Sequence, residues 1–568
     1  MNKKLYVLSI SFILILGTFS CIEVENTDGF MFRGDLYRSG VYESKVPNNN
    51  TLLWSFDTGI YRVQSSPVVV DGRIFFGSDD NNVYCLDALT GDEIWNFSTE
   101  GAVGSTPAVV DGVVYVGSAD RNLYAIDAVS KEKLWNYTYA SSPAQITSSP
   151  AVVNNMIFFA SDDNNFYALN ISKASTPELE WVFPTGNGFP PSEYQSSPAV
   201  LWPYVYFGSI DGNLYCVWAN NGTQKWAFEM EDGLEIYTTP TIYNGSIYIG
   251  GADYKINGAL YCLDAQTGEE KWRFLPPGEG RFSEVYSSAA VHDDIVFIHA
   301  WHKTPGPEEE RGTVFAIRGD LNGDGNITNN EIKWSFITWD DEGGSSPTVA
   351  DGKVLVGSTN KKLYCIDEYT GEELWNLTTG GQIVASPTVA YGIVYITSED
   401  GTLYAIGGDE PAYLEVEIIP EFPSIKSNRV MGISFNVTYR GFPIEGAFIN
   451  FEVDLGNLSQ SGASTFEDGS QRIKYNAPEV SENTTVTVHA KVTKPGYPEG
   501  NSTASFVVEP PTSYKQIKSS SMFSLSKYWL YLVAIFVLVV INVVIMYYAK
   551  RKKSDEAGKS KVQENVGE

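Results

Sequence analysis

The densest run of possible metal ligands in the sequence is DLNGDGNITNNE, residues 320–331. Every position of the pattern D-x-[DN]-x-[DN]-G-x5-E is met in this run. Carboxylate, amide and backbone carbonyl oxygens are the ligands that calcium takes in proteins. The spacing therefore predicts a calcium-binding loop, and the alternative is an Asn/Gly/Asp-rich turn without metal.

Strand-like runs flank this loop, VFAIR before it and IKWSF after it. The loop resembles those of EF-hand and dockerin modules, but no paired helices surround it, so calcium would brace a turn rather than drive an opening motion. The resemblance implies side-chain oxygens from Asp320, Asn322 and Asp324, a backbone carbonyl from Asn326, a direct or water-mediated contact from Thr328, and both carboxylate oxygens from Glu331.

The loop interrupts one unit of a repeat that organises most of the chain. Residues 65–95 define the unit: a Ser-Ser-Pro opening, two apolar runs separated by Asp-Gly, an Asp/Asn turn, a third run ending in Leu-Asp, Thr-Gly and a closing Trp. The openings recur at Pro67, Pro107, Pro150, Pro198, Pro240, Pro347 and Pro387, with Ala289 in the same slot. The closing tryptophans are Trp54, Trp95, Trp135, Trp181, Trp226, Trp272, Trp334 and Trp375.

Four short runs rich in β-branched and aromatic residues occupy each unit, and the period is about 40 to 50 residues. This pattern is typical of propeller blades. The last unit stops after its third run, at Ile406, whereas the run around Trp54 has no unit of its own. That run can complete the last blade and so remove open sheet edges. We therefore predict an all-β, eight-bladed propeller over residues 30–409.

The form A-x-T-G-x-x-x-W, at residues 88–95 and 265–272, resembles the tryptophan-docking repeat of quinoprotein (PQQ-like) propellers. The opening FRGDLYRSG, residues 32–40, resembles the entry segment of the same superfamily. Its short non-catalytic members, the barrel-assembly lipoproteins, are nearest in size. The resemblance implies that the closing tryptophans dock the blades. It also implies two possible functions, a non-catalytic scaffold or a PQQ-dependent dehydrogenase.

The residues favour the scaffold over the dehydrogenase. Dehydrogenases of this superfamily hold calcium and quinone on the propeller axis with Glu, Asn and Asp, and many place a vicinal Cys-Cys disulfide against the quinone. This chain has no Cys-Cys pair, and its calcium pattern falls in an outer turn. It also has no G-x-S-x-G elbow and no H-E-x-x-H pair. We therefore predict no catalytic residues and no PQQ, with calcium as a structural cofactor.

The turns of an antiparallel blade fall on two faces of the propeller. The first-second and third-fourth turns lie on one face, termed the first face, and the second-third turns and blade-to-blade connections lie on the other, termed the second face. Insertions lengthen the second face around units four to six, and long loops usually carry function. We expect a protein or envelope glycan to bind there. The candidate residues are Glu193, Tyr194, Tyr254, Lys255, Arg281, Phe282, Trp301, His302 and Lys303.

Histidines of unit six raise a zinc alternative. His299 and His302 lie three apart at a strand end, where alternation turns their side chains to opposite faces. This arrangement favours structural or surface histidines over a zinc site.

Further segments flank the repeat. Residues 1–21 have the basic and apolar parts of a signal peptide, and lipidation of Cys21 is the alternative to its removal. Alternating strands over residues 412–510 predict a β-sandwich that resembles bacterial Ig-like modules. Residues 511–527 form a linker, residues 528–549 an uncharged run long enough for a transmembrane helix, and residues 550–568 a basic-flanked cytoplasmic tail.

Composition limits the partners. The net charge of -30 argues against nucleic acid, whose phosphates require basic patches. Asn-x-Ser/Thr sequons recur from Asn49 to Asn501 and are candidate glycosylation sites behind a signal peptide. The sequence thus predicts a single-pass protein of the cell membrane, with the propeller and the Ig-like sandwich outside the cell.

Overall fold

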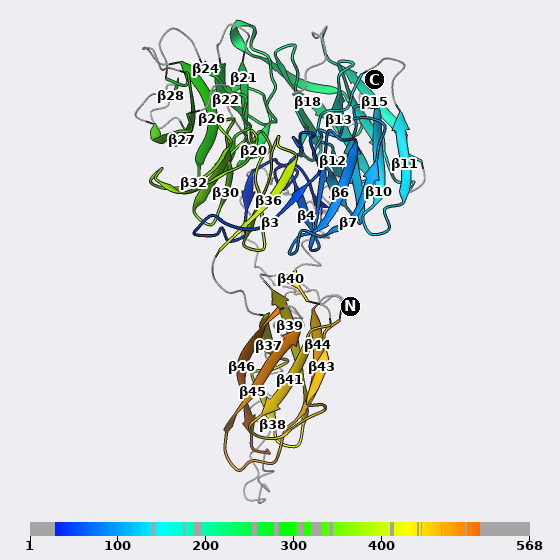
Figure 1. The fold of residues 1–568 in the computed structure, drawn as a ribbon, viewed down its shortest axis with the longest axis vertical. Helices are drawn as coiled ribbons and strands as arrows, with labels where there is room; N and C mark the ends of the chain where they lie inside the picture. The colour runs from blue at the N-terminus through cyan, green and yellow to red at the C-terminus, as the bar shows by residue number, and fades with distance from the viewer. Residues whose placement is uncertain are drawn as a thin grey trace, which may run out of the picture.

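The structure is a computed structural model of the 568-residue chain. It describes residues 29–138, 144–173, 176–186, 196–252, 258–277, 283–303, 310–319, 326–327, 331–339, 345–408, 414–439, 442–444, 446–466, 469–494 and 497–511. Across these ranges the chain is all-β, with one short 3₁₀ turn, η1 (Glu231–Gly233). Ten sheets are formed, of which the first eight precede residue 409 and make the propeller of Figure 1.

Sheets one to four follow one another along the chain, each with its strands in sequence order. Sheet one contains β4 (Val68–Val70), β5 (Arg73–Gly77), β6 (Asn82–Asp87) and β7 (Glu93–Ser98). Sheet two contains β8 (Ala108–Val110), β9 (Val113–Gly117), β10 (Asn122–Asp127) and β11 (Lys133–Thr138), with β1 (Gly29–Phe30) added beside β8. Sheet three contains β12 (Ala151–Val153), β13 (Met156–Ser161), β14 (Asn165–Asn170) and β15 (Glu178–Pro184). Sheet four contains β16 (Ala199–Leu201), β17 (Tyr204–Gly208), β18 (Asn213–Trp218) and β19 (Gln224–Glu229).

Sheets five to seven have the same order, with short additions, and in sheet eight the fourth place is taken by a strand from before sheet one. Sheet five contains β20 (Thr241–Tyr243), β21 (Ser246–Ala252), β22 (Gly258–Asp264), β23 (Glu270–Phe274) and β28 (Asn326–Ile327). Sheet six contains β24 (Ser283–Glu284), β25 (Ala290–His292), β26 (Ile295–Lys303), β27 (Glu310–Ile317) and β29 (Ile332–Ile337). Sheet seven contains β30 (Thr348–Ala350), β31 (Lys353–Gly357), β32 (Lys362–Asp367), β33 (Glu373–Thr378) and β2 (Val41–Tyr42). Sheet eight contains β34 (Thr388–Ala390), β35 (Ile393–Thr397), β36 (Thr402–Gly407) and β3 (Thr51–Asp57).

Short-range polar contacts set the turns inside each sheet. In sheet one, Asp71 and Gly72 have φ values of 47° and 74°, as a two-residue hairpin turn between β4 and β5 requires. The Asp80 carboxylate accepts the Tyr84 hydroxyl at 2.6 Å, which closes the second turn. The Asp87 carboxylate accepts the backbone N–H groups of residues 89 and 90, both at 2.9 Å, which closes the third. The repeated residues are therefore turn-forming residues.

The two hydroxyls of the Ser-Ser-Pro opening have different partners. The first binds within its own sheet: Ser105 Oγ donates to the Gly117 carbonyl at 2.8 Å and accepts the Gly117 N–H at 3.0 Å. The second links neighbouring sheets, because the Ser66 N–H donates to Thr106 Oγ1 at 3.0 Å. The two hydroxyls of one dipeptide therefore form hydrogen bonds within their own sheet and to the neighbouring sheet.

The N-terminal strand β3 completes sheet eight, as the sequence predicted. It pairs antiparallel with β36, with Trp54 opposite Ala405. Across the junction between sheets eight and one, the Ser386 N–H donates to Ser66 Oγ at 2.9 Å. The first and last sheets are thus hydrogen-bonded neighbours although 320 residues separate these two serines.

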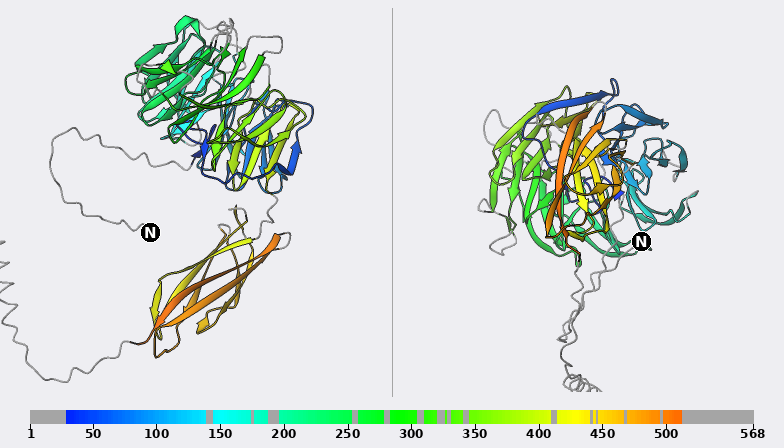
Figure 2. Two further views of the ribbon diagram at one scale, coloured as in Figure 1. Left: turned by 90° about the vertical axis from the view of Figure 1, so that its left-hand side faces the viewer. Right: turned by 90° about the horizontal axis from the view of Figure 1, so that it is seen from below.

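The last two sheets form a β-sandwich, which Figures 1 and 2 show as a separate elongated body below the propeller. Sheet nine contains β37 (Leu414–Pro420), β39 (Val430–Tyr439), β40 (Phe442–Pro443), β42 (Asn457–Leu458) and β44 (Ser470–Asn476). Sheet ten contains β38 (Ser424–Lys426), β41 (Phe448–Val453), β43 (Gly462–Ser464), β45 (Thr484–Lys494) and β46 (Tyr497–Glu509). Alternate residues of β37 are buried, as expected for a sheet with one face on a core.

The predicted membrane localisation needs correction. In the part of the chain that the structure describes, no helix has the length and apolar character needed to cross a membrane. This finding contradicts the single-pass assignment, which rested on the apolar length of residues 528–549 and on the basic residues that follow them. That segment, the preceding linker from residue 512, the tail and the signal peptide all lie outside the described residues.

Candidate functional site

The segment that follows β1 crosses the inner strands of the propeller. Its backbone carbonyls at residues 36, 37 and 40 accept N–H groups from Val200 in sheet four, Ile242 in sheet five and Val349 in sheet seven, at 2.8 to 2.9 Å. These inner strands surround the propeller axis. The segment therefore occupies the axis and contacts several sheets at once.

Two arginines of this segment are buried on the axis. Arg38, 0% exposed, donates to the carbonyls of Phe32, Pro198 and Pro150 at 2.7, 2.8 and 3.2 Å. Arg33, 3% exposed, donates to the carbonyls of Arg38 and Ala289. Burial lowers the pKa of Arg33 to about 10 and that of Arg38 to about 9, so both guanidinium groups stay protonated at neutral pH.

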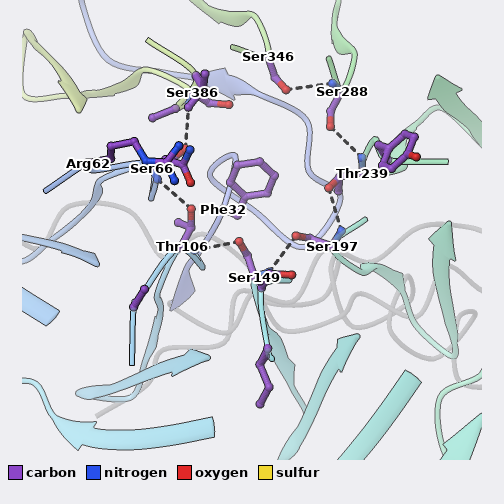
Figure 3. Close-up of a pocket in the computed structure, with 18 of the residues that line it drawn as sticks. Phe32, Arg62, Ser66, Thr106, Ser149, Ser197, Thr239, Ser288, Ser346 and Ser386 are labelled. Carbon is purple, nitrogen blue, oxygen red and sulfur yellow. Dashed lines mark hydrogen bonds between the residues drawn. The ribbon is translucent and has the colours of Figure 1, made fainter. Parts of the chain in front are cut away.

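A ring of hydroxyls lies around Phe32 of the same segment (Figure 3). Each sheet contributes one, the second hydroxyl of its opening: Ser66, Thr106, Ser149, Ser197, Thr239, Ser288, Ser346 and Ser386. Backbone N–H groups of neighbouring members donate to these hydroxyls at 2.9 to 3.1 Å, from Ser66 through to Ser346 and again from Ser386 to Ser66. We call this set the hydroxyl ring.

The hydroxyl ring and Phe32 form the floor of a cavity of about 450 Å³. Its lining includes Gln64, Gln145, Tyr237 and Tyr286, and Arg62 is the one basic side chain among the described lining residues. Arg62 is already paired, with Asp79 at 3.4 Å and with Glu399 at 3.7 Å. The cavity is thus polar, and its single cation is neutralised by carboxylates.

The cavity opens on the second face. Its lining residues come from blade-to-blade connections, such as those of Gln64 and Tyr286, and from second-third turns, such as those of Asp79 and Ala119. This is the face on which the sequence placed the binding surface. The sequence did not lead us to predict the cavity, although its floor is formed by the second residue of each Ser-Ser-Pro opening and by Phe32 of the segment FRGD.

Three of the nine predicted binding residues belong to the part of the chain that the structure describes. Glu193, Tyr194, Tyr254, Lys255, Arg281 and Phe282 lie outside the described residues. Trp301 is only 6% exposed, because β24 pairs across the end of β26 with Glu284 opposite Trp301. Its indole is therefore packed in the fold and is not presented to a partner. His302 and Lys303 belong to β26, and only their backbone is described.

The predicted calcium loop lies between β27 and β29, at the third-fourth turn of sheet six. Asp320, Asn322, Asp324 and Thr328 lie outside the described residues. The backbone of Asn326 belongs to β28, which pairs parallel with β23 of sheet five. Ile327 is 8% exposed, within the cluster that holds Trp272 and Phe315, and Glu331 is 4% exposed. No cluster of three or more metal-ligating His, Cys, Asp or Glu side chains exists within the described ranges.

The closing tryptophans lie between neighbouring sheets. Several indole N–H groups donate to carbonyls of the next sheet: Trp95 to Ala128, Trp181 to Ala219, Trp226 to Ala265, Trp334 to Glu368 and Trp375 to Pro47. Trp135 and Trp272 are 8% and 7% exposed. A Cβ on Gly91 would lie 2.5 Å from the Trp54 indole, so Trp54 of sheet eight packs directly on sheet one.

Two histidines of sheet six, His292 and His299, have protein partners. His292 Nδ1 lies 2.7 Å from the buried Glu368 carboxylate, and His299 Nε2 lies 2.9 Å from Thr338 Oγ1. The first contact links sheet six to sheet seven, and the second lies within sheet six, because Thr338 directly follows β29. The side chain of His302 lies outside the described residues, so the choice between structural histidines and a zinc site stays a prediction.

Comparison with protein families identifies the class of propeller. The family model described as outer membrane protein assembly factor BamB matches residues 44–273, 181–330 and 323–410, which together exceed half of the chain. The chain belongs to this family of PQQ-like repeat propellers. BamB of Shewanella oneidensis is 32% identical over 69 residues, which covers 12% of this chain and 18% of that protein. The match therefore spans less than a fifth of that relative's length.

Solved structures share the fold. BamB from Moraxella catarrhalis superposes with a TM-score of 0.50 at 16% identity, covering 63% of this chain and 99% of that one. A europium-containing methanol dehydrogenase gives a TM-score of 0.55 at 15% identity, covering 68% and 99%. The quinohemoprotein alcohol dehydrogenase from Comamonas testosteroni gives 0.54 at 16% identity, covering 69% and 83%. At these identities the likeness concerns the propeller fold alone.

Proposed function

We propose that this protein is a non-catalytic binding protein whose second face receives a protein or glycan partner. The observation that carries the proposal is the polar cavity on the propeller axis. Among its described lining residues, hydroxyls and amides predominate, and Arg62 is held between two carboxylates. Convergent polar groups in a concave site of about 300–1,000 Å³ are typical of binding sites.

The architecture proposed with this function is an eight-bladed propeller followed by an Ig-like sandwich. In support, each of the eight sheets supplies one member of the hydroxyl ring. Across the closing junction, Thr388 Oγ1 donates to the Pro67 carbonyl at 2.6 Å, and the Tyr395 hydroxyl donates to the Ala88 carbonyl at 3.0 Å. The two packed sheets after residue 413 support the Ig-like module.

A quinone-dependent dehydrogenase is the competing function, and the described lining residues do not fit the quinone. PQQ is a planar tricarboxylate, and carboxylates bind best to unpaired arginines or lysines. Arg62 is already shared by Asp79 and Glu399. The other polar groups are mainly neutral hydroxyls and amides, which would not balance the charge of PQQ. We therefore derive no reaction step through this cofactor.

Site-specific photo-crosslinking in cells of the source organism tests the binding role. A benzophenone amino acid replaces either Tyr61, on a second-face connection, or Tyr369, on a first-face turn. The two tyrosines are matched controls because each is 53% exposed. We expect adducts from Tyr61 and none from Tyr369. Equal yields at both positions, or quinone-dependent oxidation of alcohols by the purified protein, would contradict the proposal.

We also propose that Asp320, Asn322, Asp324, Asn326, Thr328 and Glu331 bind one calcium ion that braces sheet six. The sequence pattern supports this proposal, and so does the burial of Ile327, which anchors that part of the chain against sheet five. In calorimetric titration of the metal-free full chain, we expect one calcium per chain and a higher melting temperature. Binding should be lost in the Asp324→Ala/Glu331→Ala variant, and unchanged calcium heat in that variant would overturn the assignment.

A further inference from the structure

We propose that the axial cavity binds a neutral carbohydrate, such as a monosaccharide, a disaccharide or the terminal sugar of a glycan. The inference rests on the proposed binding role and specifies its ligand. It depends on three properties of the cavity: unused hydroxyl donors on the floor, carboxylates at the mouth, and aromatic surface on the floor and wall.

The floor offers hydrogen-bond donors that no described residue accepts. Seven of the eight ring hydroxyls accept a backbone N–H, and none of the eight donates its own proton to a described residue. Seven of the eight residues are also buried, with Thr239 3% exposed and Ser66 and Ser197 each 4% exposed, and Ser346 is partly exposed. A hydroxyl is both a donor and an acceptor, so each ring member keeps one proton for a ligand oxygen.

The mouth offers acceptors and disfavours anions. Asp79, which lines the cavity, and Glu399, which lies behind the lining, flank Arg62, and Glu399 also accepts the Gln64 amide at 2.9 Å. Carboxylates thus outnumber the cation at this position, and a negatively charged ligand would be repelled there. A cation is disfavoured at the floor, because Arg33 and Arg38 lie buried on the axis beyond Phe32, with the Arg38 guanidinium 5.9 Å from the centre of the Phe32 ring.

Aromatic rings add apolar surface to the polar lining. Tyr237 and Tyr286 lie in edge-to-face contact with ring centres 5.7 Å apart, and Tyr286 is 38% exposed. Phe32 lies at the centre of the hydroxyl ring (Figure 3). A sugar has C–H faces that pack on such rings, oxygens that accept from the floor and hydroxyl protons that reach carboxylates. A neutral polyol therefore uses every part of this cavity, whereas a tricarboxylate does not.

The test measures binding of defined probes to the full chain. Glucose, galactose, mannose, N-acetylglucosamine and their disaccharides are screened by saturation-transfer NMR, and hits are titrated calorimetrically. Citrate and glucuronate serve as anionic probes. We expect a Kd between about 10 μM and 1 mM for at least one neutral sugar, and no binding of the anions.

Two adjacent threonines provide a matched pair of variants. Thr239 belongs to the hydroxyl ring and accepts the Ser197 N–H, whereas Thr238 donates to the Gly250 carbonyl, accepts the Gly250 N–H within its own sheet and is not part of the cavity. Both substitutions replace a hydroxyl with a methyl group, and Thr238→Val, which loses two hydrogen bonds, should lower the melting temperature at least as much as Thr239→Val. Only Thr239→Val should weaken sugar binding, by at least tenfold. Tyr286→Ala, at an exposed position, should weaken it without affecting folding.

The outcomes separate this inference from the proposed function. Equal sugar affinity in the two threonine variants would overturn it, as would binding of citrate in place of sugars. Absence of binding by every probe, with crosslinks from Tyr61 retained, would overturn the carbohydrate site and leave the binding role intact. Absence of sugar binding together with absence of crosslinks from Tyr61 would contradict both the carbohydrate site and the binding role.

Discussion

Replacement of Arg38 by alanine should lower the free energy of unfolding by about 3 to 5 kcal/mol. The Arg38 guanidinium supplies donors to three carbonyls, those of Phe32, Pro150 and Pro198, which come from the axial segment and from sheets three and four. Each buried acceptor left without a donor costs about 1 to 3 kcal/mol. Removal of a buried charge offsets part of this loss, which is why the expected total lies below the sum of three full penalties.

Urea denaturation of the full chain measures this effect. Arg38→Lys should not restore stability, because a single ammonium cannot replace a planar guanidinium that spans three acceptors. Arg62→Ala is the control, since the Arg62 side chain is 48% exposed and its ion pairs contribute at most about 1 kcal/mol. If Arg38→Ala were as stable as Arg62→Ala, the axial segment would not hold the sheets together.

Gly91→Ala should destabilise the propeller by about 2 to 4 kcal/mol, far more than Gly112→Ala. Both glycines have left-handed backbones, with φ values of 75° and 74°, so the backbone cost of about 1 to 2 kcal/mol is shared. They differ in surroundings. A Cβ on Gly91 would lie 2.5 Å from the Trp54 indole, whereas a Cβ on Gly112 would meet no atom within 4 Å. The additional loss of stability in Gly91→Ala therefore measures the contact between sheets eight and one.

A double-mutant cycle checks that interpretation. In a Trp54→Ala background, Gly91→Ala should cost no more than Gly112→Ala, because the clashing ring is gone. The coupling between positions 54 and 91 should therefore be about 1 to 2 kcal/mol. Additive effects would mean that the first and last sheets do not depend on each other for stability.

Contacts between residues close in sequence made the propeller predictable. The Asp-Gly turns, the Asp87-type carboxylates and the Asp80–Tyr84 contact each join residues only a few positions apart. Such contacts recur whenever the residues recur, so a repeat in sequence becomes a repeat of sheets. The pairing of β3 with β36 was also predictable, because one unit lacked its fourth strand and one strand lacked its unit.

The burial of a side chain could not be predicted where it depends on a strand pairing that the local residue types do not specify. Trp301 lies in an insertion of the second face, whose length predicted a binding surface. The structure covers it because the two-residue strand β24 folds back along β26, and nothing in the local residue types specifies that pairing. The single-pass localisation was also wrong, because the part of the chain that the structure describes holds no helix long and apolar enough to cross a membrane.

The sequence by itself determined the repeat, the turns, the docking tryptophans and the face on which a partner was expected. Only the tertiary structure decided that the second hydroxyl of every opening points to one cavity, and that Phe32, Arg33 and Arg38 occupy the axis beneath it. Ser66 and Ser386 are neighbours there although 320 residues separate them. A site made of one residue per sheet exists only when the sheets close into a ring, so no single unit of the sequence can reveal it.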